Sequence, residues 1–176
     1  MAVAISIYPA SSLVAGPNKR GGKNGPLKMT EADITWLKSR LRQVCRNMGI
    51  RNGVWAVQIV TDSEMEFLHQ KFFGIAETTD VITFDMRGEG CRLPTDPLEL
   101  DTAICADEAH RQSCRREIDL RSELLLYSVH SLLHVSGYDD KNPADARRMH
   151  RREDELLTDL GIGPVYQKSR NATCRR

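Results

Sequence analysis

The chain has 176 residues, is 40% hydrophobic and carries a formal net charge of +1 at pH 7. This length and apolar content predict one domain with a buried core, and the near-neutral charge argues against binding of nucleic acid through a global basic field. The five cysteines have irregular spacing and no C-x2-C pair, which argues against a zinc knuckle and favours reduced thiols without disulfide partners in a cytoplasmic protein. Pro9 interrupts an N-terminal apolar run that also lacks a basic region, so we expect neither a signal peptide nor a membrane span.

The first half of the chain alternates apolar segments with runs of Gly, Pro, Ser, Asn and Lys, a pattern typical of short elements joined by loops. Thr30, which two acidic residues follow, is the expected N-cap of one helix, and Asp62 or Ser63 is that of the next. The expected elements are a strand at 3–8, a flexible basic loop at 11–28, a helix from 30 to 49, a strand at 54–61 and a helix closed by Gly74.

The second half predicts two more strands and three helices that mix without strict alternation. We therefore expect an α+β fold with a single small mixed sheet packed by about five helices, in one domain over residues 1–163. A basic tail at 164–176 is expected to be disordered. The expected elements are strands at 78–86 and 98–106, a loop at 87–97, a short helix near 107–115, an apolar helix at 119–136 and a last helix at 143–160.

The apolar helix carries the pattern H-x3-H-x2-G-x2-D, and it is the segment around which the function is expected to be organised. His130 and His134 leave the same helix face, and Gly137 can end the helix and return Asp140 toward both imidazoles. An isolated H-x3-H pair often binds nothing, but two uncommitted imidazoles on so apolar a helix would be costly to bury. Two imidazoles and a carboxylate leave positions open for water, which is typical of a catalytic metal site.

Five segments of the chain, read in order, resemble the motifs of one known family. YSVHSLLHVSGYDD resembles the HGxLHLLGYDH stretch that holds the H-x3-H-x5-H metal motif of the YbeY endoribonucleases. TTDVITF is similar to their PTDVLSF segment, FLHQKFFG to LNxxYRG, LELDTAICA to LGDIVI, and EDELLTDLGI to the end of their last helix. The resemblance covers about residues 54–163 and implies a metal-dependent endoribonuclease that cleaves single-stranded RNA during ribosomal RNA maturation and quality control.

The departures from the family pattern fall on residues expected to contact metal or substrate. The third metal histidine of the family corresponds to Asp140, which can still bind a metal ion. The arginine of LNxxYRG corresponds to Phe73, and Lys71 is the nearest cation. Phe73 cannot hold a phosphate as arginine does, so both residues are only candidate substrate contacts.

The resemblance implies one divalent ion, with Zn²⁺ expected first and Ni²⁺, Mn²⁺ or Fe²⁺ as alternatives. It implies single-stranded RNA, ribosomal RNA and the small ribosomal subunit as partners. Asp80, Asp139 and Ser131 are the candidates for a general base. The arginine pairs at 115–116, 147–148 and 151–152 could line an RNA path or form a solvated face.

Two other functions remain open at the level of sequence. The H-x3-H-x2-G-x2-D frame also resembles that of the metzincin metalloproteases, although Ser131 stands where those enzymes carry the glutamate base. The changes at Phe73 and Asp140 also leave room for a ribosome-associated factor with reduced or no catalytic activity.

Overall fold

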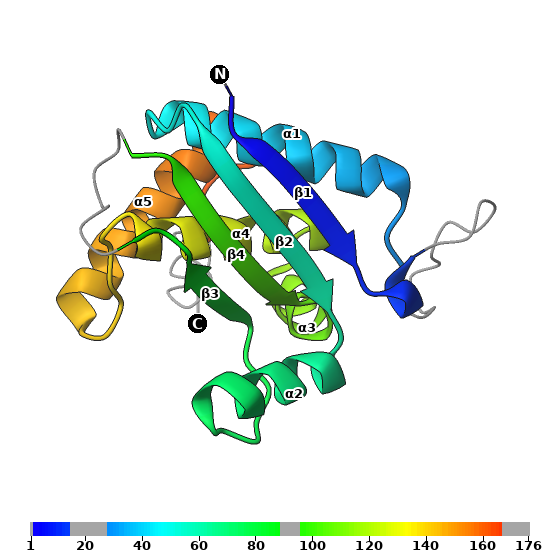
Figure 1. The fold of residues 1–176 in the computed structure, drawn as a ribbon. Coiled ribbons are helices and arrows are strands. Elements are labelled where there is room, and N and C mark those ends of the chain that lie inside the picture. Colours follow the sequence, from blue (N-terminus) through cyan, green and yellow to red (C-terminus); the bar gives the residue numbers. More distant parts are fainter. Residues whose placement is uncertain (1, 15–27, 89–95, 167–176) are drawn as a thin grey trace, which may run out of the picture.

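The computed structural model describes residues 2–14, 28–88 and 96–166. Within these residues a four-stranded sheet packs against helices (Figure 1). The strands are β1 (Ala4–Pro9), β2 (Gly53–Val60), β3 (Val81–Asp85) and β4 (Leu98–Cys105). The helices are α1 (Glu31–Asn47), α2 (Asp62–Phe73), α3 (Ala106–Arg116), α4 (Leu120–Val135) and α5 (Pro143–Asp159), with a short 3-10 turn at Ser11–Leu13.

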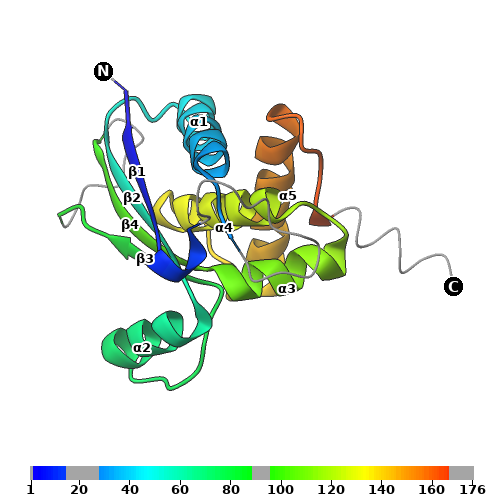
Figure 2. The same cartoon turned by 90° about the vertical axis from the view of Figure 1, so that its right-hand side faces the viewer.

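The sheet is mixed, as the sequence predicts. Its strand order is β1-β2-β4-β3, with β1, β2 and β4 parallel and β3 antiparallel to β4. The helices α1, α3, α4 and α5 lie on one side of the sheet, and α2 lies beside one end of it (Figure 2). Tyr8 and Val54 project from the opposite face and are more than half exposed. One face of the sheet therefore supplies the core, and the other is open to solvent.

Helix α4 lies at the centre of the helical layer, where it packs against α1, α3, α5, β3 and β4. Its residues are apolar around most of the circumference, which is the composition of a buried helix. Buried hydrogen bonds connect α4 to the sheet. Ser131 Oγ lies 2.9 Å from Thr83 Oγ1 and 2.8 Å from Thr102 Oγ1. The indole N–H of Trp55 donates to Thr102 Oγ at 3.0 Å. These contacts fix the position of the two helical histidines relative to β3 and β4.

Several expected boundaries are confirmed and others are wrong; the strand expected at 78–86, for example, is β3 at Val81–Asp85. Thr30 caps α1, but Thr61 rather than Asp62 or Ser63 caps α2, because its side chain forms a capping box with Glu64. The expected loop at 11–28 begins with an ordered turn that buries Leu13, and residues 15–27 lie outside the described residues.

The domain also extends beyond the expected limit at residue 163. The backbone N–H groups of Val165 and Tyr166 donate to Asp154 Oδ1 at 2.7 and 3.0 Å, and Val165 is buried. The first residues of the expected tail are therefore part of the folded domain, while residues 167–176 lie outside the described residues. No helix in the described part of the chain is long and apolar enough to cross a membrane.

Candidate metal centre and the cavity beside it

The candidate metal centre lies at the C-terminal end of α4. His130 and His134 are one helical turn apart, and their rings meet at 86° with centroids 4.5 Å apart. Their Nε2 atoms are separated by 2.9 Å. The i, i+4 spacing therefore brings both imidazoles to one point, as the sequence predicts.

The chain reverses immediately after α4 and returns Asp140 to this point. Gly137 has a φ of 91°, and its N–H donates to the carbonyl of His134 while that of Tyr138 donates to the carbonyl of Leu133. A left-handed residue at this position is the usual way to end a helix. Asp140 Oδ2 lies 3.7 Å from His130 Nε2, and Oδ1 lies 3.9 Å from His134 Nε2.

The tautomers of the two histidines indicate what this point is suited to hold. His130 Nδ1 lies 2.8 Å from Glu153 Oε1, and His134 Nδ1 lies 3.3 Å from the carbonyl oxygen of Tyr138. Both partners are acceptors, so each Nδ1 carries the proton, and in the neutral rings each Nε2 presents a lone pair. Two lone pairs 2.9 Å apart repel each other unless a proton or a metal ion lies between them. The donor set therefore fits a bound cation.

The distances also fit a tetrahedral ion. Ligand atoms bound to zinc at about 2.0–2.1 Å lie about 3.3 Å from one another. The three separations here, 2.9, 3.7 and 3.9 Å, bracket that value. Glu153 is fully buried and orients His130, which is the carboxylate–histidine arrangement that supports many metal ligands. Although desolvation opposes the effect, hydrogen bonding and charge from Glu153 raise the pKa of His130.

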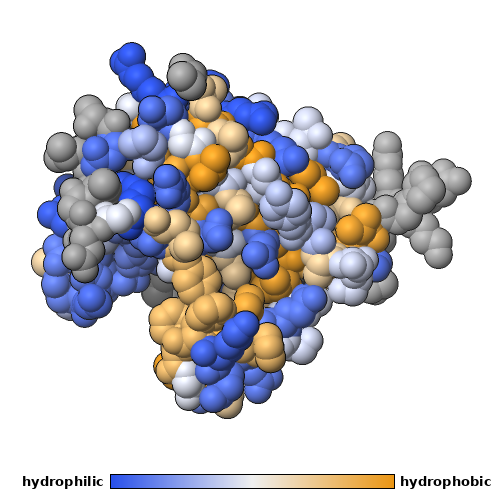
Figure 3. Space-filling view, in the orientation of Figure 1, coloured by the Kyte–Doolittle hydropathy of each residue, from blue (hydrophilic) through white to orange (hydrophobic). Residues whose placement is uncertain are grey.

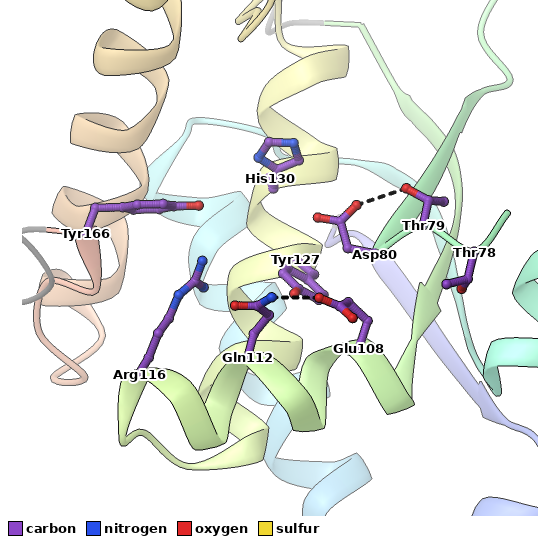
Figure 4. Close-up of a pocket in the computed structure, with 9 residues that line it drawn as sticks. All are labelled: Thr78, Thr79, Asp80, Glu108, Gln112, Arg116, Tyr127, His130 and Tyr166. Atoms are coloured by element: carbon purple, nitrogen blue, oxygen red, sulfur yellow. Dashed lines mark hydrogen bonds between the residues drawn. The ribbon is translucent and has the colours of Figure 1, made fainter.

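The three candidates for a general base have different surroundings. Ser131 is fully buried, and its hydroxyl is engaged with Thr83 and Thr102, so a substrate cannot reach it. Asp139 accepts from the backbone N–H groups of Asp140 and Lys141 in the turn after α4. Desolvation opposes the effect, but these bonds lower the pKa of Asp139, which weakens it as a base. Asp80 lies at the start of β3, with its carboxylate in the cavity beside His130 (Figure 4).

Lys71 and Phe73 lie at the end of α2 and are not among the residues that line the cavity beside His130. The side chain of Phe73 is 55% exposed, and its ring lies 5.5 Å from that of His69. The ammonium of Lys71 lies over the rings of Phe67 and Phe72, at 5.9 and 5.4 Å from their centroids. Phe73 is therefore not a core residue, and both side chains are exposed to solvent.

A second group of potential ligands is formed by Asp62, Cys105 and Asp107. Both carboxylate oxygens of Asp62 accept from the guanidinium of Arg111, at 2.7 and 2.8 Å. Hydrogen bonding to Arg111 lowers the pKa of Asp62 to about 2, and burial raises the pKa of Cys105 to about 11. The Asp62 carboxylate is already paired with Arg111, and the Cys105 thiol keeps its proton, so these three residues do not favour a metal ion.

A cavity of about 320 Å³ opens directly beside His130 (Figure 4). It is enclosed by α3, α4, the segment before β3 and the segment after α5. The ring of Tyr166 forms one wall, stacked on His150 with centroids 3.9 Å apart and with the Arg116 guanidinium 5.3 Å from its centroid. The lining residues are Thr78, Thr79, Asp80, Glu108, Gln112, Arg116, Tyr127, His130 and Tyr166.

Two buried glutamates behind this cavity were not predicted from the sequence. Glu123 is fully buried and receives a hydrogen bond from Arg116, and Glu153 is fully buried beside His130. Desolvation raises the pKa of Glu123, although Arg116 opposes the rise. Glu153 lies four residues after Met149 and four before Leu157, on the buried face of α5. An acid at this position of the apolar pattern is the feature of the sequence that could have indicated a buried carboxylate.

Comparison with known proteins gives a consistent assignment. The family model described as "Endoribonuclease YbeY" matches residues 23–161. The endoribonuclease YbeY of Chloroflexus aurantiacus is 36% identical over 111 residues, which are 60% of this chain and 72% of that protein. The endoribonuclease YbeY of Syntrophus aciditrophicus is 30% identical over 133 residues, which are 74% of this chain and 82% of that protein.

A solved structure has the same fold. The solution structure of TM1509 from Thermotoga maritima superposes with a TM-score of 0.53 at 19% sequence identity, covering 93% of this chain and 95% of that one. The order of the motifs, the mixed sheet and the match of the family model over most of the sequence agree with one another. The chain therefore belongs to the YbeY family of endoribonucleases.

Proposed function

We propose that this protein is a metal-dependent endoribonuclease that cleaves single-stranded RNA in the maturation of ribosomal RNA, with its ion held by His130, His134 and Asp140. The observation that carries the proposal is the pair of Nε2 atoms 2.9 Å apart, with both Nδ1 atoms committed to acceptors. A divalent ion there would lower the pKa of a bound water molecule and polarise a phosphoryl oxygen, as phosphodiester hydrolysis requires. Zn²⁺ suits two imidazoles and one carboxylate, with Ni²⁺, Mn²⁺ and Fe²⁺ as alternatives.

The protein's own groups would bind and orient the RNA around this point. Glu153 fixes the ring of His130, and the turn at Gly137 fixes Asp140. The cavity beside His130 can receive a part of the substrate next to the bond that is cleaved. A protease mechanism of the metzincin type is not favoured, because Ser131 replaces the glutamate base and is fully buried.

The experiment that tests the proposal compares RNA and protein substrates under the same conditions. Purified protein should be stripped with a chelator and then given Zn²⁺, Mn²⁺, Ni²⁺ or Fe²⁺ in turn. We expect cleavage of a single-stranded RNA to disappear on stripping and to return with metal, while casein remains intact. Hydrolysis of casein without hydrolysis of RNA would favour the protease, and ribosome association without either activity would favour a non-catalytic factor.

Glu153 provides a prediction specific to this site. Loss of the carboxylate that orients a metal-binding histidine typically reduces metal affinity by about 10–100-fold. We expect Glu153→Gln to reduce zinc affinity within this range, as measured by competition with a chromophoric chelator. The control is Glu155→Gln on the same helix, because Glu155 is exposed and pairs with Arg152 at 2.9 Å. Equal affinity for the two variants would show that Glu153 does not support the ion.

An exposed apolar patch on α2 and the end of β3 supports a substrate-binding role for Lys71 and Phe73. Figure 3 shows apolar side chains gathered over α2, at the bottom of the view. Exposed aromatic rings beside a cation are a typical platform for the stacking of single-stranded bases. We propose that RNA contacts this platform. Its exposed members are Phe67, Phe72, Phe73, Ile75 and Met86.

Phe73→Arg should strengthen RNA binding without loss of stability, because the side chain is 55% exposed and an arginine there can reach a phosphate. One added phosphate contact steepens the dependence of log K on log salt by about 0.7 for single strands. The control is Tyr8→Arg, since Tyr8 is 58% exposed on β1 at the opposite edge of the sheet from β3. Identical salt slopes for the two variants would contradict the platform, and binding titrations at three salt concentrations measure them.

A ribosomal partner forms part of the same proposal. An endoribonuclease that matures ribosomal RNA must meet its substrate on or near the small subunit. We expect the purified protein to sediment with small subunits in a sucrose gradient. We expect Phe73→Arg to remain bound at low salt.

A further inference from the structure

The cavity beside His130 contains more polar groups than the proposed hydrolysis uses. Its volume of about 320 Å³ lies at the lower end of the range of about 300–1,000 Å³ for small-molecule sites. Of the three proposed metal ligands, only His130 lines this cavity. The other lining residues can therefore contact a part of the substrate other than the phosphate at the ion. Their hydrogen-bonding capacity identifies which part fits.

The acceptors lie in the first turn of α3 and in the segment before β3. Asp80 Oδ1 accepts from Thr79 Oγ and from the backbone N–H of Val81, whereas Oδ2 has no donor among the described residues. Glu108 accepts from Arg111 and from Gln112 Nε2. An ionised carboxylate can only accept hydrogen bonds, so a ligand in this part of the cavity must donate them.

The donors of Arg116 lie at the opposite, C-terminal end of α3. Arg116 uses Nη1 to hold buried Glu123, and its Nε and Nη2 groups have no acceptor among the described residues. Figure 4 shows Asp80 and Arg116 on opposite sides of the cavity, with the hydroxyl of Tyr166 pointing inward from the side of Arg116. A ligand here must therefore donate along one edge and accept along another.

A phosphate group does not meet this requirement, because it presents only acceptors to Asp80 and Glu108. The local field is also negative: burial first, and then the charges of neighbouring carboxylates that include Asp80, raise the pKa of Tyr127 and of Tyr166. Among the RNA bases, guanine alone has two adjacent donors, N1–H and the 2-amino group, and two adjacent acceptors, O6 and N7, on separate edges. Arginine recognises the O6 and N7 pair by a bidentate contact.

We propose that this cavity binds the guanine base of a nucleotide adjacent to the scissile phosphate, with Asp80 Oδ2 accepting from N1–H and the 2-amino group and with Arg116 Nε and Nη2 donating to O6 and N7. The location next to the scissile phosphate rests on the proposed function, but the recognition of guanine does not. In this arrangement Asp80 recognises the guanine base of the substrate and does not act as a general base.

The test measures binding of the four nucleoside 5′-monophosphates to the purified protein by calorimetry, in the presence of a chelator so that cleavage and metal binding do not enter. We expect GMP to bind at least about tenfold more tightly than AMP, CMP or UMP, the discrimination that one good bidentate contact provides. Equal affinities, or a preference for another base, would overturn the inference without affecting the proposed ribonuclease activity.

Two variants locate the contact. Asp80→Asn should reduce GMP affinity to the level of the other nucleotides and leave AMP binding unchanged. Arg116→Lys keeps a cation beside Glu123 but removes the bidentate fork, so it should also reduce the preference for GMP. The control is Arg121→Lys on α4, because Arg121 pairs with Asp119 outside the cavity. A preference for GMP that remains in both cavity variants would place the guanine elsewhere and overturn the inference. If a variant fails to fold, the comparison of the four nucleotides on the wild-type protein still tests the preference for GMP.

The same preference should appear in RNA cleavage. In an oligonucleotide of adenosines with a single guanosine, we expect cuts at the phosphates that flank the guanosine. Cleavage without such a preference would overturn the inference and leave the proposed function intact. Preferential binding of GMP by a protein that cleaves no RNA would retain the pocket and reject the ribonuclease.

Discussion

His130→Ala should purify with less than about a tenth of an equivalent of zinc and should lose detectable cleavage of single-stranded RNA. His130 is one of the three proposed ligands, and its loss also removes the hydrogen-bond partner of buried Glu153. Loss of a supporting residue alone typically reduces affinity by about 10–100-fold, so loss of a direct ligand should exceed this range. Mass spectrometry for metals and a gel assay for RNA cleavage measure the two effects.

The matched control for this variant is His110→Ala, since His110 is exposed on α3 and is not among the residues that line the cavity beside His130. It should keep both metal and activity. Full metal content in His130→Ala would place the ion elsewhere, and full activity without metal would reject a metal-dependent reaction.

Arg116→Met should reduce the free energy of unfolding by about 3–5 kcal/mol, because it leaves the charge of Glu123 buried and uncompensated. The control is Arg121→Met, whose ion pairs with Asp33 and Asp119 are partly exposed and should contribute about 0–1 kcal/mol. Denaturation in urea compares the three proteins. A deficit of less than about 1 kcal/mol for Arg116→Met would show that the pair is well solvated in the folded state.

The loss of unfolding free energy in Arg116→Met should also depend on pH. Desolvation raises the pKa of Glu123, and Arg116 opposes this rise, so the pKa of Glu123 rises further in Arg116→Met. Between the ordinary carboxyl pKa and the raised one, the folded state binds a proton that the unfolded state has released. Stability then falls as the pH rises, so the deficit should be smaller at pH 5 than at pH 8. The double variant Arg116→Met, Glu123→Met should recover much of the lost stability at both pH values.

The sequence predicted the central helix and the convergence of His130, His134 and Asp140 because those features are local. The i, i+4 spacing of His130 and His134 and the glycine at 137 fix a geometry that needs no distant contact. The strand and helix order also follows from local periodicity, and the structure confirms an α+β fold with a mixed sheet. The match of family motifs over much of the chain then gives the reaction class.

The surroundings of the site could not be predicted in the same way, because they depend on contacts between distant segments. Glu123 and Glu153 stand in helices where an acid is usually solvated, and only tertiary packing buries them. Arg116 was expected either on a solvated face or on an RNA path, and it turns inward because Glu123 lies behind it. Tyr166 was assigned to a disordered tail, but Asp154 fixes its backbone and its ring forms a cavity wall.

The central claim is that one divalent ion is bound by His130, His134 and Asp140. Crystals of the zinc-loaded protein, measured on both sides of the zinc absorption edge, test it most directly. We predict a single anomalous difference peak about 2.0–2.1 Å from both Nε2 atoms and within bonding distance of the Asp140 carboxylate. A peak beside Asp62, Cys105 and Asp107, or no peak between the two histidines at full zinc occupancy, would contradict the account.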